Sequence, residues 1–275
     1  MTLGAAPPPS EHGRATGTPD GTATPAATLE IKNLEVRYGS VTVAKDVTFS
    51  VSPGEIVGLI GPNGAGKSSV LGAVAGEIGQ VRGTVLIEGR DVTHLSAFRR
   101  SRAGMVRTFQ TARVYDGMTV FESLCMAARG QAGASLGETV LHHHRQRRAE
   151  QVAAAQVWAL LRRFGLEMVA NHLGSELSGG QRRLIELLMA LIRSPVLLVL
   201  DEPTVGVARV LVPGLLEELR NEGEQGVAVL IVEHALEIVE SLCDRVLVMA
   251  NGAVISEGTY GEVVADSEVR EAYLA

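Results

Sequence analysis

The sequence contains little cysteine, few aromatic residues and no long apolar run. Its two cysteines, Cys125 and Cys243, lie far apart, so they predict neither a disulfide framework nor a zinc site. No apolar run approaches the roughly 18 to 20 residues that span a bilayer, so the chain is not expected to cross a membrane. The net charge of −6 gives no basic footprint, and no nucleic-acid partner is therefore expected.

The overall composition is that of a globular protein. Hydrophobic residues make up 46% of the 275 residues and charged residues 20%, which is typical of a domain with a buried core. Residues 1–27 differ, because they are rich in Pro, Gly, Ala and Thr and lack the apolar region of a secretory signal. We expect a disordered tail at 1–27 and a folded domain at 28–275.

Short apolar strands alternate with helical patterns along the folded part. Apolar residues roughly alternate over 29–51, and the stretches EIVGLI, VLLVL and VAVLIV are typical of buried strands. Strands that alternate with helices predict an α/β fold with a parallel sheet. A mostly helical block, roughly residues 95–180, interrupts the alternation and is expected to form a subdomain of its own.

One glycine-rich segment carries the strongest chemical signal. GPNGAGKSS fits the phosphate-loop pattern and stands between a predicted strand and a predicted helix, as that pattern requires. Backbone N–H groups in such a loop surround phosphate oxygens, and the helix N-terminus adds a favourable dipole. A turn that only links strand to helix is the alternative, and the full spacing disfavours it. The expected nucleotide-binding residues are Gly61, Pro62, Asn63, Gly64, Ala65, Gly66, Lys67, Ser68 and Ser69.

Four polar side chains supply the expected chemistry. Lys67 is expected to reach the β- and γ-phosphates, and Ser68 to place its hydroxyl on Mg²⁺. Asp201 ends the predicted strand VLLVL and can hold Mg²⁺ through water, while Glu202 beside it is the expected general base for the attacking water. Two acids after a strand more often cap the next helix, but the phosphate loop upstream favours the catalytic interpretation.

A third motif, LSGGQRR, begins another predicted helix. Ser178 is well placed to cap this helix, and Pro195 prevents it from continuing. Gly179 and Gly180 form a second backbone surface that a phosphate could approach closely. In isolation the motif indicates no more than a capped helix.

The motifs GPNGAGKSS, LSGGQ, LDEP and IVEH, with Gln110 between the first two, stand in the order and approximate spacing of the ATP-binding subunits of ABC transporters. The chain resembles that family over residues 29–275. The resemblance implies an α/β P-loop NTPase fold, an ABC-type ATPase domain with a RecA-like core, an antiparallel β subdomain and an α-helical subdomain. It also implies binding of ATP and Mg²⁺, and ATP hydrolysis coupled to transmembrane transport.

The resemblance assigns roles to further residues. Gln110 is implied to contact Mg²⁺ and the attacking water, and His234 to contact the γ-phosphate. Tyr38 is similar to the aromatic residue that stacks on adenine, although a tyrosine that merely ends a strand fits equally well. Members of the family dimerise head to tail, which implies contact with the ATP of a partner chain by Ser178, Gly179, Gly180 and Gln181.

One position departs from the family pattern. Many members have Asp or Asn shortly after the position of Glu202, where that residue links the two sites of the dimer. This chain has Ala208 there, and alanine offers no side-chain hydrogen bond. The departure bears on communication between the two sites and not on ATP binding.

The segment RTFQ and the ending VREAYLA resemble subunits that energise uptake of branched-chain amino acids, or of urea and short amides. ATP-binding subunits do not touch the cargo, so this is association and not chemistry. The alternatives are export of lipid or polysaccharide, and a soluble ABC ATPase of DNA repair or translation. The resemblance implies a second ATP-binding subunit (with a heterodimer favoured), two permease subunits, indirectly a substrate-binding protein, and a peripheral place at the cytoplasmic face of the membrane.

A short apolar segment precedes the next predicted helix. Thr119 and Glu122 form a capping box, so a helix is predicted to begin at Val120. Three side chains before it are either buried beneath the helical block or line a groove for a short permease helix: Val114, Tyr115 and Met118.

The single tryptophan, Trp158, lies within another helical pattern. Apolar residues at compatible spacing are Val152, Ala155 and Phe164. We expect these four side chains to form one stripe that packs in the core.

Overall fold

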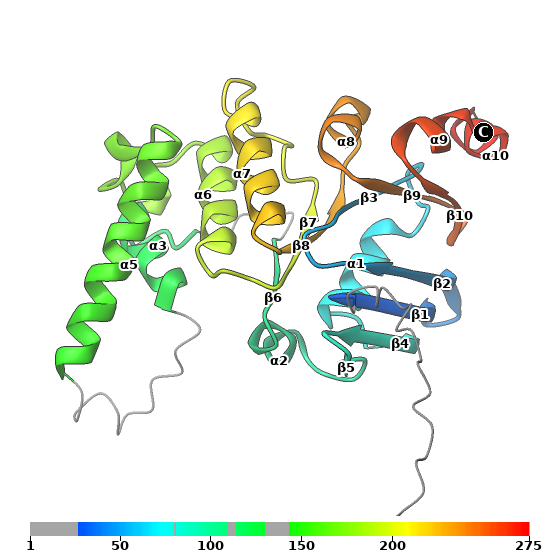
Figure 1. Cartoon of the computed structure of the whole chain (residues 1–275), viewed down its shortest axis with the longest axis horizontal. Coiled ribbons are helices and arrows are strands. Elements are labelled where there is room, and N and C mark those ends of the chain that lie inside the picture. The colour runs from blue at the N-terminus through cyan, green and yellow to red at the C-terminus, as the bar shows by residue number, and fades with distance from the viewer. Residues whose placement is uncertain (1–26, 80, 109–113, 130–142, 275) are drawn as a thin grey trace, which may run out of the picture.

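The computed structural model describes residues 27–79, 81–108, 114–129 and 143–274 of the 275-residue chain (Figure 1). Residues 1–26 of the predicted tail and Gln110 lie outside the described residues. In Figure 1 the chain extends from two sheets at one end to a group of helices at the other.

Strands in the described ranges form two sheets. The smaller has the order β2-β1-β4-β5, and the larger has the order β10-β9-β3-β8-β7-β6. Neighbouring strands of the larger sheet are parallel, except that β10 runs antiparallel to β9. The strands are β1 (Leu29–Tyr38), β2 (Val41–Val51), β3 (Ile56–Ile60), β4 (Val81–Ile87), β5 (Arg90–Asp91), β6 (Met105–Arg107), β7 (Leu197–Asp201), β8 (Ala228–Val232), β9 (Arg245–Ala250) and β10 (Ala253–Gly258).

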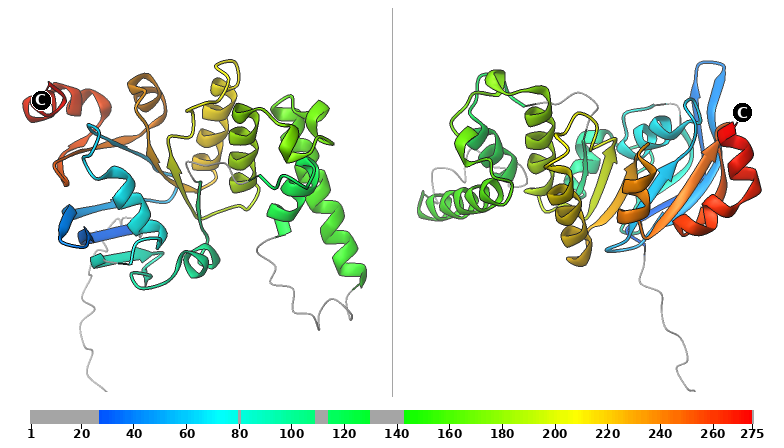
Figure 2. Two further views of the ribbon diagram at one scale, coloured as in Figure 1. Left: turned by 180° about the vertical axis from the view of Figure 1, so that it is seen from behind. Right: turned by 90° about the horizontal axis from the view of Figure 1, so that it is seen from above.

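Helices link the strands and cover the larger sheet (Figure 2). Within the described ranges, none combines the length and the apolar character that crossing a bilayer requires. The helices are α1 (Lys67–Ala75), α2 (Ala97–Arg102), α3 (Val120–Arg129), α5 (His143–Arg163), α6 (Gly179–Leu191), α7 (Val212–Glu224), α8 (Leu236–Leu242), α9 (Tyr260–Ala265) and α10 (Ser267–Leu274), with 3₁₀ turns η1 (Glu167–Val169) and η2 (Gly174–Glu176).

The two faces of the larger sheet contribute to two different cores. On β7, Leu197 and Val199 join a core with α1 and the smaller sheet, while Leu198 and Leu200 join a core with α6 and α7. This division follows from the two-residue period of side chains along a strand. Because both faces are covered, every residue of β3, β7 and β8 is buried, which confirms the prediction of buried parallel strands.

The carboxyl ends of β3, β7 and β8 lie at one edge of the sheet, because these neighbouring strands are parallel. β3 leads into the loop 61–69, β7 ends at Asp201, and β8 is followed by Glu233 and His234. In open α/β sheets ligands bind beyond the carboxyl ends of the strands. The topology therefore gathers three segments that are far apart in the sequence.

The helix α3 begins at Val120, as the capping box predicts. The Thr119 N–H donates to Glu122 Oε2 at 2.9 Å, and the Glu122 N–H donates to Thr119 Oγ1 at 3.1 Å. Of the apolar residues before it, Val114 is buried whereas Tyr115 is exposed. Met118 is half-buried. Burial beneath the helical block therefore holds for Val114, and a permease groove at Tyr115 and Met118 stays a prediction.

The predicted stripe around Trp158 is right for two of its four members. Phe164 is buried and Trp158 is half-buried against the same core, with its ring centroid 5.3 Å from that of Phe121. Val152 and Ala155, in contrast, are exposed. Alanines occur on several sides of α5, so the apolar spacing alone did not identify the face that packs. Within residues 150–163 of this helix, the side chains buried in the core are Ala153, Val157 and Leu161.

The range predicted for the helical subdomain, roughly residues 95–180, contains one strand of the larger sheet. The short strand β6 pairs in parallel with β7, so the chain returns to the sheet between α2 and α3. The pairing sets Arg107 opposite Val199, two residues before Asp201. A three-residue strand carries too little pattern to be recognised inside a helical block.

A buried arginine joins α2 to the end of α1. Arg100 is 1% exposed, and its guanidinium donates to the carbonyl oxygens of Ala73 and Val74 at 2.6 Å each, of Thr93 at 2.7 Å and of Leu95 at 3.0 Å. Burial lowers the pKa of Arg100 to about 10. Its positive charge lies at the negative end of the α1 dipole, which favours this position.

Replacing Arg100 by Met is expected to destabilise the fold by about 3 kcal/mol, since several buried carbonyl groups lose a charged donor. The free energy of unfolding in urea measures the loss. Arg99→Met, on the exposed side of the same helix, is the control and should change stability by less than about 0.5 kcal/mol. Equal losses in the two variants would contradict the structural role of Arg100.

Candidate nucleotide-binding site

The loop 61–69 has a backbone that only glycine fits at two of its positions. Gly61 has a φ of 146°, and a Cβ there would clash with the carbonyl oxygen of Met249. Gly66 has a φ of 98°, and its Cβ would lie 2.5 Å from the carbonyl oxygen of Val43. The backbone of Met249 and of Val43 thus approaches these two glycines so closely that it fixes the shape of the loop.

Lys67 is held inside this loop. Its Nζ donates to the carbonyl oxygens of Gly61 at 2.8 Å and Pro62 at 3.0 Å, and the residue is 6% exposed. Burial lowers the pKa of Lys67, and the negative charges of Glu202 and Asp201 oppose that shift. The ammonium group thus lies within the loop whose glycines were predicted to surround phosphate.

The remaining loop residues are arranged around this lysine. Ala65 is buried, whereas Asn63 and Gly64 are exposed at the tip. Ser68 lies in the first turn of α1, at the positive end of the helix dipole, with Ser69 after it. Both serines therefore lie at the end of α1 that favours an anion.

A cavity of about 540 Å³ adjoins the loop, and both Tyr38 and Ser68 line it. Tyr38 ends β1 and is 53% exposed, so its ring is accessible. Glu77 and Arg107 line the same cavity. The structure thus brings Tyr38 to the phosphate loop, and its stacking on adenine stays a prediction.

Asp201 offers a carboxylate oxygen that fits a metal ion. The residue is 1% exposed, and its Oδ2 accepts a hydrogen bond from Arg107 at 3.2 Å. Its Oδ1 is buried and has no hydrogen-bond partner within the described part of the chain. Mg²⁺ favours carboxylate, hydroxyl and water oxygens, so Asp201 and Ser68 suit the predicted metal. Gln110, the third predicted ligand, lies outside the described residues.

The two predicted catalytic side chains meet at the sheet edge. Glu202 Oε1 lies 2.9 Å from His234 Nε2, although the residues are 32 positions apart. Glu202 has a φ of 49°, a left-handed conformation that non-glycine residues seldom adopt and that often marks functional positions. Its N–H donates to the carbonyl oxygen of Val232 at 2.9 Å, which fixes it beside the end of β8.

The third motif begins α6 as predicted. The Ser178 N–H donates to Gln181 Oε1 at 2.9 Å, and the Gln181 N–H donates to Ser178 Oγ at 3.3 Å, so the two residues form a capping box. A Cβ on Gly180 would lie 2.5 Å from the carbonyl oxygen of Gly206, in the loop that also carries the exposed Ala208. Contact of Ser178, Gly179, Gly180 and Gln181 with the ATP of a partner stays a prediction.

Two arginines of the site escaped the sequence analysis. Arg107 bridges Asp201 and Glu77, with a distance of 2.8 Å to Glu77 Oε2. Arg183 of α6 donates to the carbonyl oxygens of Asp201 at 2.6 Å and Glu202 at 3.2 Å. Arg107 begins the segment RTFQ and Arg183 ends the motif LSGGQRR, but neither string indicates that its arginine would bind Asp201 or Glu202.

Two family profiles match the sequence. The profile described as "ABC transporter" covers residues 44–205, and the one described as "Branched-chain amino acid ATP-binding cassette transporter" covers residues 253–274. The probable branched-chain amino acid transport ATP-binding protein LivG of Archaeoglobus fulgidus is 35% identical over 90% of this chain and 95% of its own length. The lipopolysaccharide export system ATP-binding protein LptB of Escherichia coli K12 is 32% identical over 90% and 97%.

Solved structures agree in fold. A nucleotide-free ATP-binding cassette from an ABC transporter superposes with a TM-score of 0.75 at 30% identity, over 90% of this chain and 99% of that one. An ATP-binding cassette of an ABC transporter in its ADP conformation gives a TM-score of 0.74 at 30% identity, over the same shares.

Arg107→Met is expected to destabilise the protein by about 3 kcal/mol in the absence of Mg²⁺ and ATP, because the buried Asp201 loses its paired cation. A bound metal ion would supply positive charge next to the same carboxylate, so saturating Mg²⁺ with a non-hydrolysable ATP analogue should shrink this loss. Urea unfolding with and without the ligands measures both values.

The control for this comparison is Arg82→Met, since Arg82 is exposed on β4. It should change stability by less than about 0.5 kcal/mol in either condition. A loss in Arg107→Met that stays the same with and without the ligands would contradict metal binding beside Asp201.

Proposed function

The chain belongs to the ABC transporter family, and on this premise we propose that it energises an importer of branched-chain amino acids. It is an ATPase subunit, since hydrolysis of ATP is the activity of this family's nucleotide-binding domain. The observation that carries the choice of cargo is the match of residues 253–274 to the branched-chain amino acid profile.

The relatives support one second candidate. LivG of Escherichia coli K12, a high-affinity branched-chain amino acid transport protein, is 33% identical, and LptB of the same organism is 32% identical. Identities this similar do not separate import of amino acids from export of lipopolysaccharide. The C-terminal match favours import, and uptake of urea or amides rests on the sequence resemblance.

The proposed hydrolysis uses the residues at the sheet edge. The loop 61–69 and Lys67 bind the phosphates, and Ser68, Gln110 and Asp201 would hold Mg²⁺, which supplies positive charge to the transferred phosphoryl group. Glu202 accepts a proton from the attacking water, because its carboxylate lies at the same edge as the loop. His234, 2.9 Å from Glu202, orients that carboxylate and reaches the γ-phosphate.

Glu202→Gln should bind ATP and form the closed dimer but hydrolyse ATP at least about 10²-fold more slowly, since the amide cannot accept the proton. Phosphate release measures turnover, and gel filtration with ATP measures dimerisation. Glu237→Gln, an exposed carboxylate of α8, is the matched control and should behave as wild type. Near-normal turnover in Glu202→Gln would remove Glu202 from this role.

The proposed partners are a second ATP-binding subunit, two permease subunits and, indirectly, a substrate-binding protein. The dimer closes on ATP held between the loop 61–69 of one chain and Ser178, Gly179, Gly180 and Gln181 of the other, with a paralogous partner favoured. The permease holds the chain at the cytoplasmic face of the membrane.

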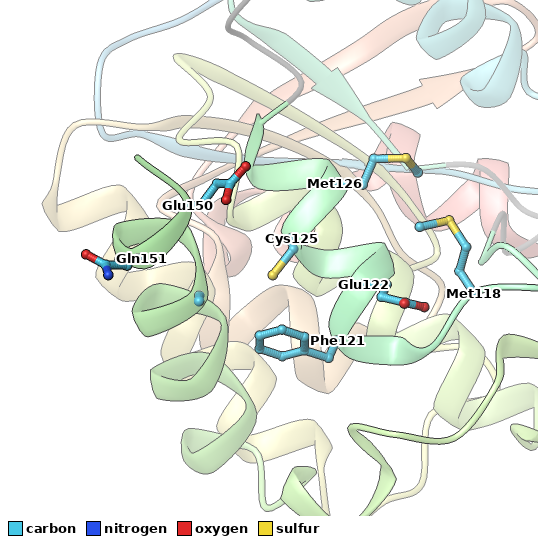
Figure 3. Close-up of a pocket in the computed structure, with 8 residues that line it drawn as sticks. Met118, Phe121, Glu122, Cys125, Met126, Glu150 and Gln151 are labelled. Carbon is cyan, nitrogen blue, oxygen red and sulfur yellow. The ribbon is translucent and has the colours of Figure 1, made fainter. Parts of the chain in front are cut away.

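A groove between α3 and α5 fits the permease contact. It encloses about 680 Å³, and Figure 3 shows Phe121 and Cys125 pointing from α3 toward α5. Met126 lines both this groove and a second cavity of about 410 Å³ that includes Tyr115. The apolar lining residues Met118, Phe121 and Met126 suit the apolar face of a short helix, and the polar lining residues Glu122, Glu150 and Gln151 suit its polar side.

Met126→Glu is expected to weaken co-purification of the permease at least about tenfold, because a charge would be buried against an apolar helix. ATP hydrolysis by the isolated chain should not change. Met168→Glu is the control, since Met168 is 88% exposed and lies outside the groove lining. Full permease recovery with Met126→Glu would exclude this groove as the contact.

Uptake in cells that lack this chain tests the cargo. Labelled leucine uptake should be lost, restored by the wild type and not restored by Lys67→Ala, because Lys67 is needed to bind the phosphates. Labelled urea is measured in the same cells. Loss of urea uptake alone would reassign the cargo, and unchanged uptake of both would reject import of either while leaving the ATPase activity intact.

A further inference from the structure

We propose that Glu233 is a positioning residue. Through its hydrogen bonds to Thr204 it keeps the Glu202 carboxylate and the His234 ring in place relative to each other. This inference rests on the catalytic roles proposed above for Glu202 and His234. It adds two residues to the site that belong to neither the phosphate loop nor the metal ligands.

The carboxylate of Glu233 joins two loops. Glu233 directly follows β8 and is 2% exposed. Its Oε1 accepts hydrogen bonds from the Thr204 N–H at 3.1 Å and the Thr204 hydroxyl at 2.7 Å, and its Oε2 accepts one from the His234 N–H at 3.3 Å. One buried side chain therefore ties the loop after β7 to the loop after β8.

The hydrogen bonds between Thr204 and Glu233 hold the chain just after Glu202, where the pairing of β7 with β8 has ended. Before Glu202, β7 pairs with β8, and the Glu202 N–H donates to the carbonyl oxygen of Val232 at 2.9 Å. After it, the chain is held at Thr204 by Glu233. Glu202 lies between these two anchors with a φ of 49°, a conformation that persists only where the surroundings impose it.

The same carboxylate fixes the other member of the pair. Because Glu233 is peptide-bonded to His234, the contact between Glu233 and Thr204 also restrains the backbone next to the histidine, whose ring reaches Glu202 Oε1 at 2.9 Å. Release of Glu233 would let both loops shift. A displacement of about 1 Å between reacting groups can slow catalysis by about 10²-fold.

Glu233 is not itself placed to act on the water. Both of its oxygens accept hydrogen bonds from backbone or hydroxyl donors, and the residue is almost fully buried. The competing explanation is that Glu233 only satisfies buried donors, which would affect stability and not turnover. The two explanations differ in what should change when the contact between Thr204 and Glu233 is weakened. A positioning role predicts lower turnover, and a purely structural role predicts lower stability alone.

The experiment compares Thr204→Val with Thr204→Ser in the full chain. Valine keeps the size of the side chain and removes the hydroxyl donor to Glu233, whereas serine retains the donor. Turnover should fall about tenfold in Thr204→Val and stay within about twofold of wild type in Thr204→Ser, a range expected for partial misplacement of catalytic groups. The KM for ATP and the binding of a fluorescent ATP analogue should differ little between the two variants. Thr204→Val should lower the Tm by a few degrees, because a buried carboxylate loses a donor, so turnover is measured well below the Tm of both variants.

Glu233→Leu provides the second arm, because leucine removes both oxygens that accept hydrogen bonds from Thr204 and His234. It should lower turnover at least as much as Thr204→Val, and adding Thr204→Val to it should cost nothing further, because both changes remove the contact between Thr204 and Glu233. If Glu233→Leu does not fold, the threonine pair still decides. Equal turnover in Thr204→Val and Thr204→Ser, or a loss that merely follows weaker ATP binding or a lower Tm, would overturn the inference.

Glu202→Gln, measured in parallel, distinguishes failure of the proposed catalytic role of Glu202 from failure of the positioning role of Glu233. If it is inactive while Thr204→Val is as active as Thr204→Ser, the role of Glu202 stands and the positioning role of Glu233 falls. If Glu202→Gln retains near-normal turnover, the proposed catalytic role fails and the positioning role falls with it.

Discussion

The parallel pairing of β3, β8 and β7 is the constraint on which the rest of the site depends. Pairing in one direction puts the ends of these strands at one edge, and covering both faces of the sheet buries the strands completely. The phosphate loop directly follows β3, Asp201 ends β7 with Glu202 after it, and His234 is the second residue after β8. In a site built in this way, buried strands hold the functional residues, and the ligand binds at the edge where those strands end.

The buried charges at this edge are held by specific partners. Lys67 donates to loop carbonyls, Asp201 accepts from Arg107, and Glu233 accepts from Thr204 and the His234 backbone. Isolated buried charges are costly, so these contacts make the arrangement possible before any nucleotide binds. Asp201 Oδ1, which has no hydrogen-bond partner among the residues that the structure describes, is the exception that fits a metal ion.

Hydrogen bonds and strand pairing connect the carboxyl-terminal edge of the larger sheet to α6 and to the segment before α3, where contacts with other chains are expected. Arg183 joins the start of α6 to the carbonyl groups of Asp201 and Glu202, and β6 joins Arg107 to the segment that leads toward α3. Arg183 therefore connects α6 directly to the residues of the site, whereas Met118 of the groove follows Arg107 by 11 residues in the sequence. The contact through Arg183 gives a physical route by which ATP hydrolysis and movement of a partner chain can be coupled.

Local patterns in the sequence were sufficient for most of the strands but not for β6, and for the phosphate loop, the capping box that begins α3 and the Ser178 cap that begins α6. Each of these depends on residues a few positions apart, whose geometry the backbone itself fixes. The packing face of α5 was mispredicted, because its alanines allow several faces and only the neighbouring α3 selects one. The pairs Arg107–Asp201 and Thr204–Glu233 join residues 94 and 29 positions apart, and no spacing rule connects them. The sequence determined which groups the protein has for chemistry, whereas the tertiary structure decided which of them touch, because contact between distant residues depends on strand order and packing and not on local backbone geometry.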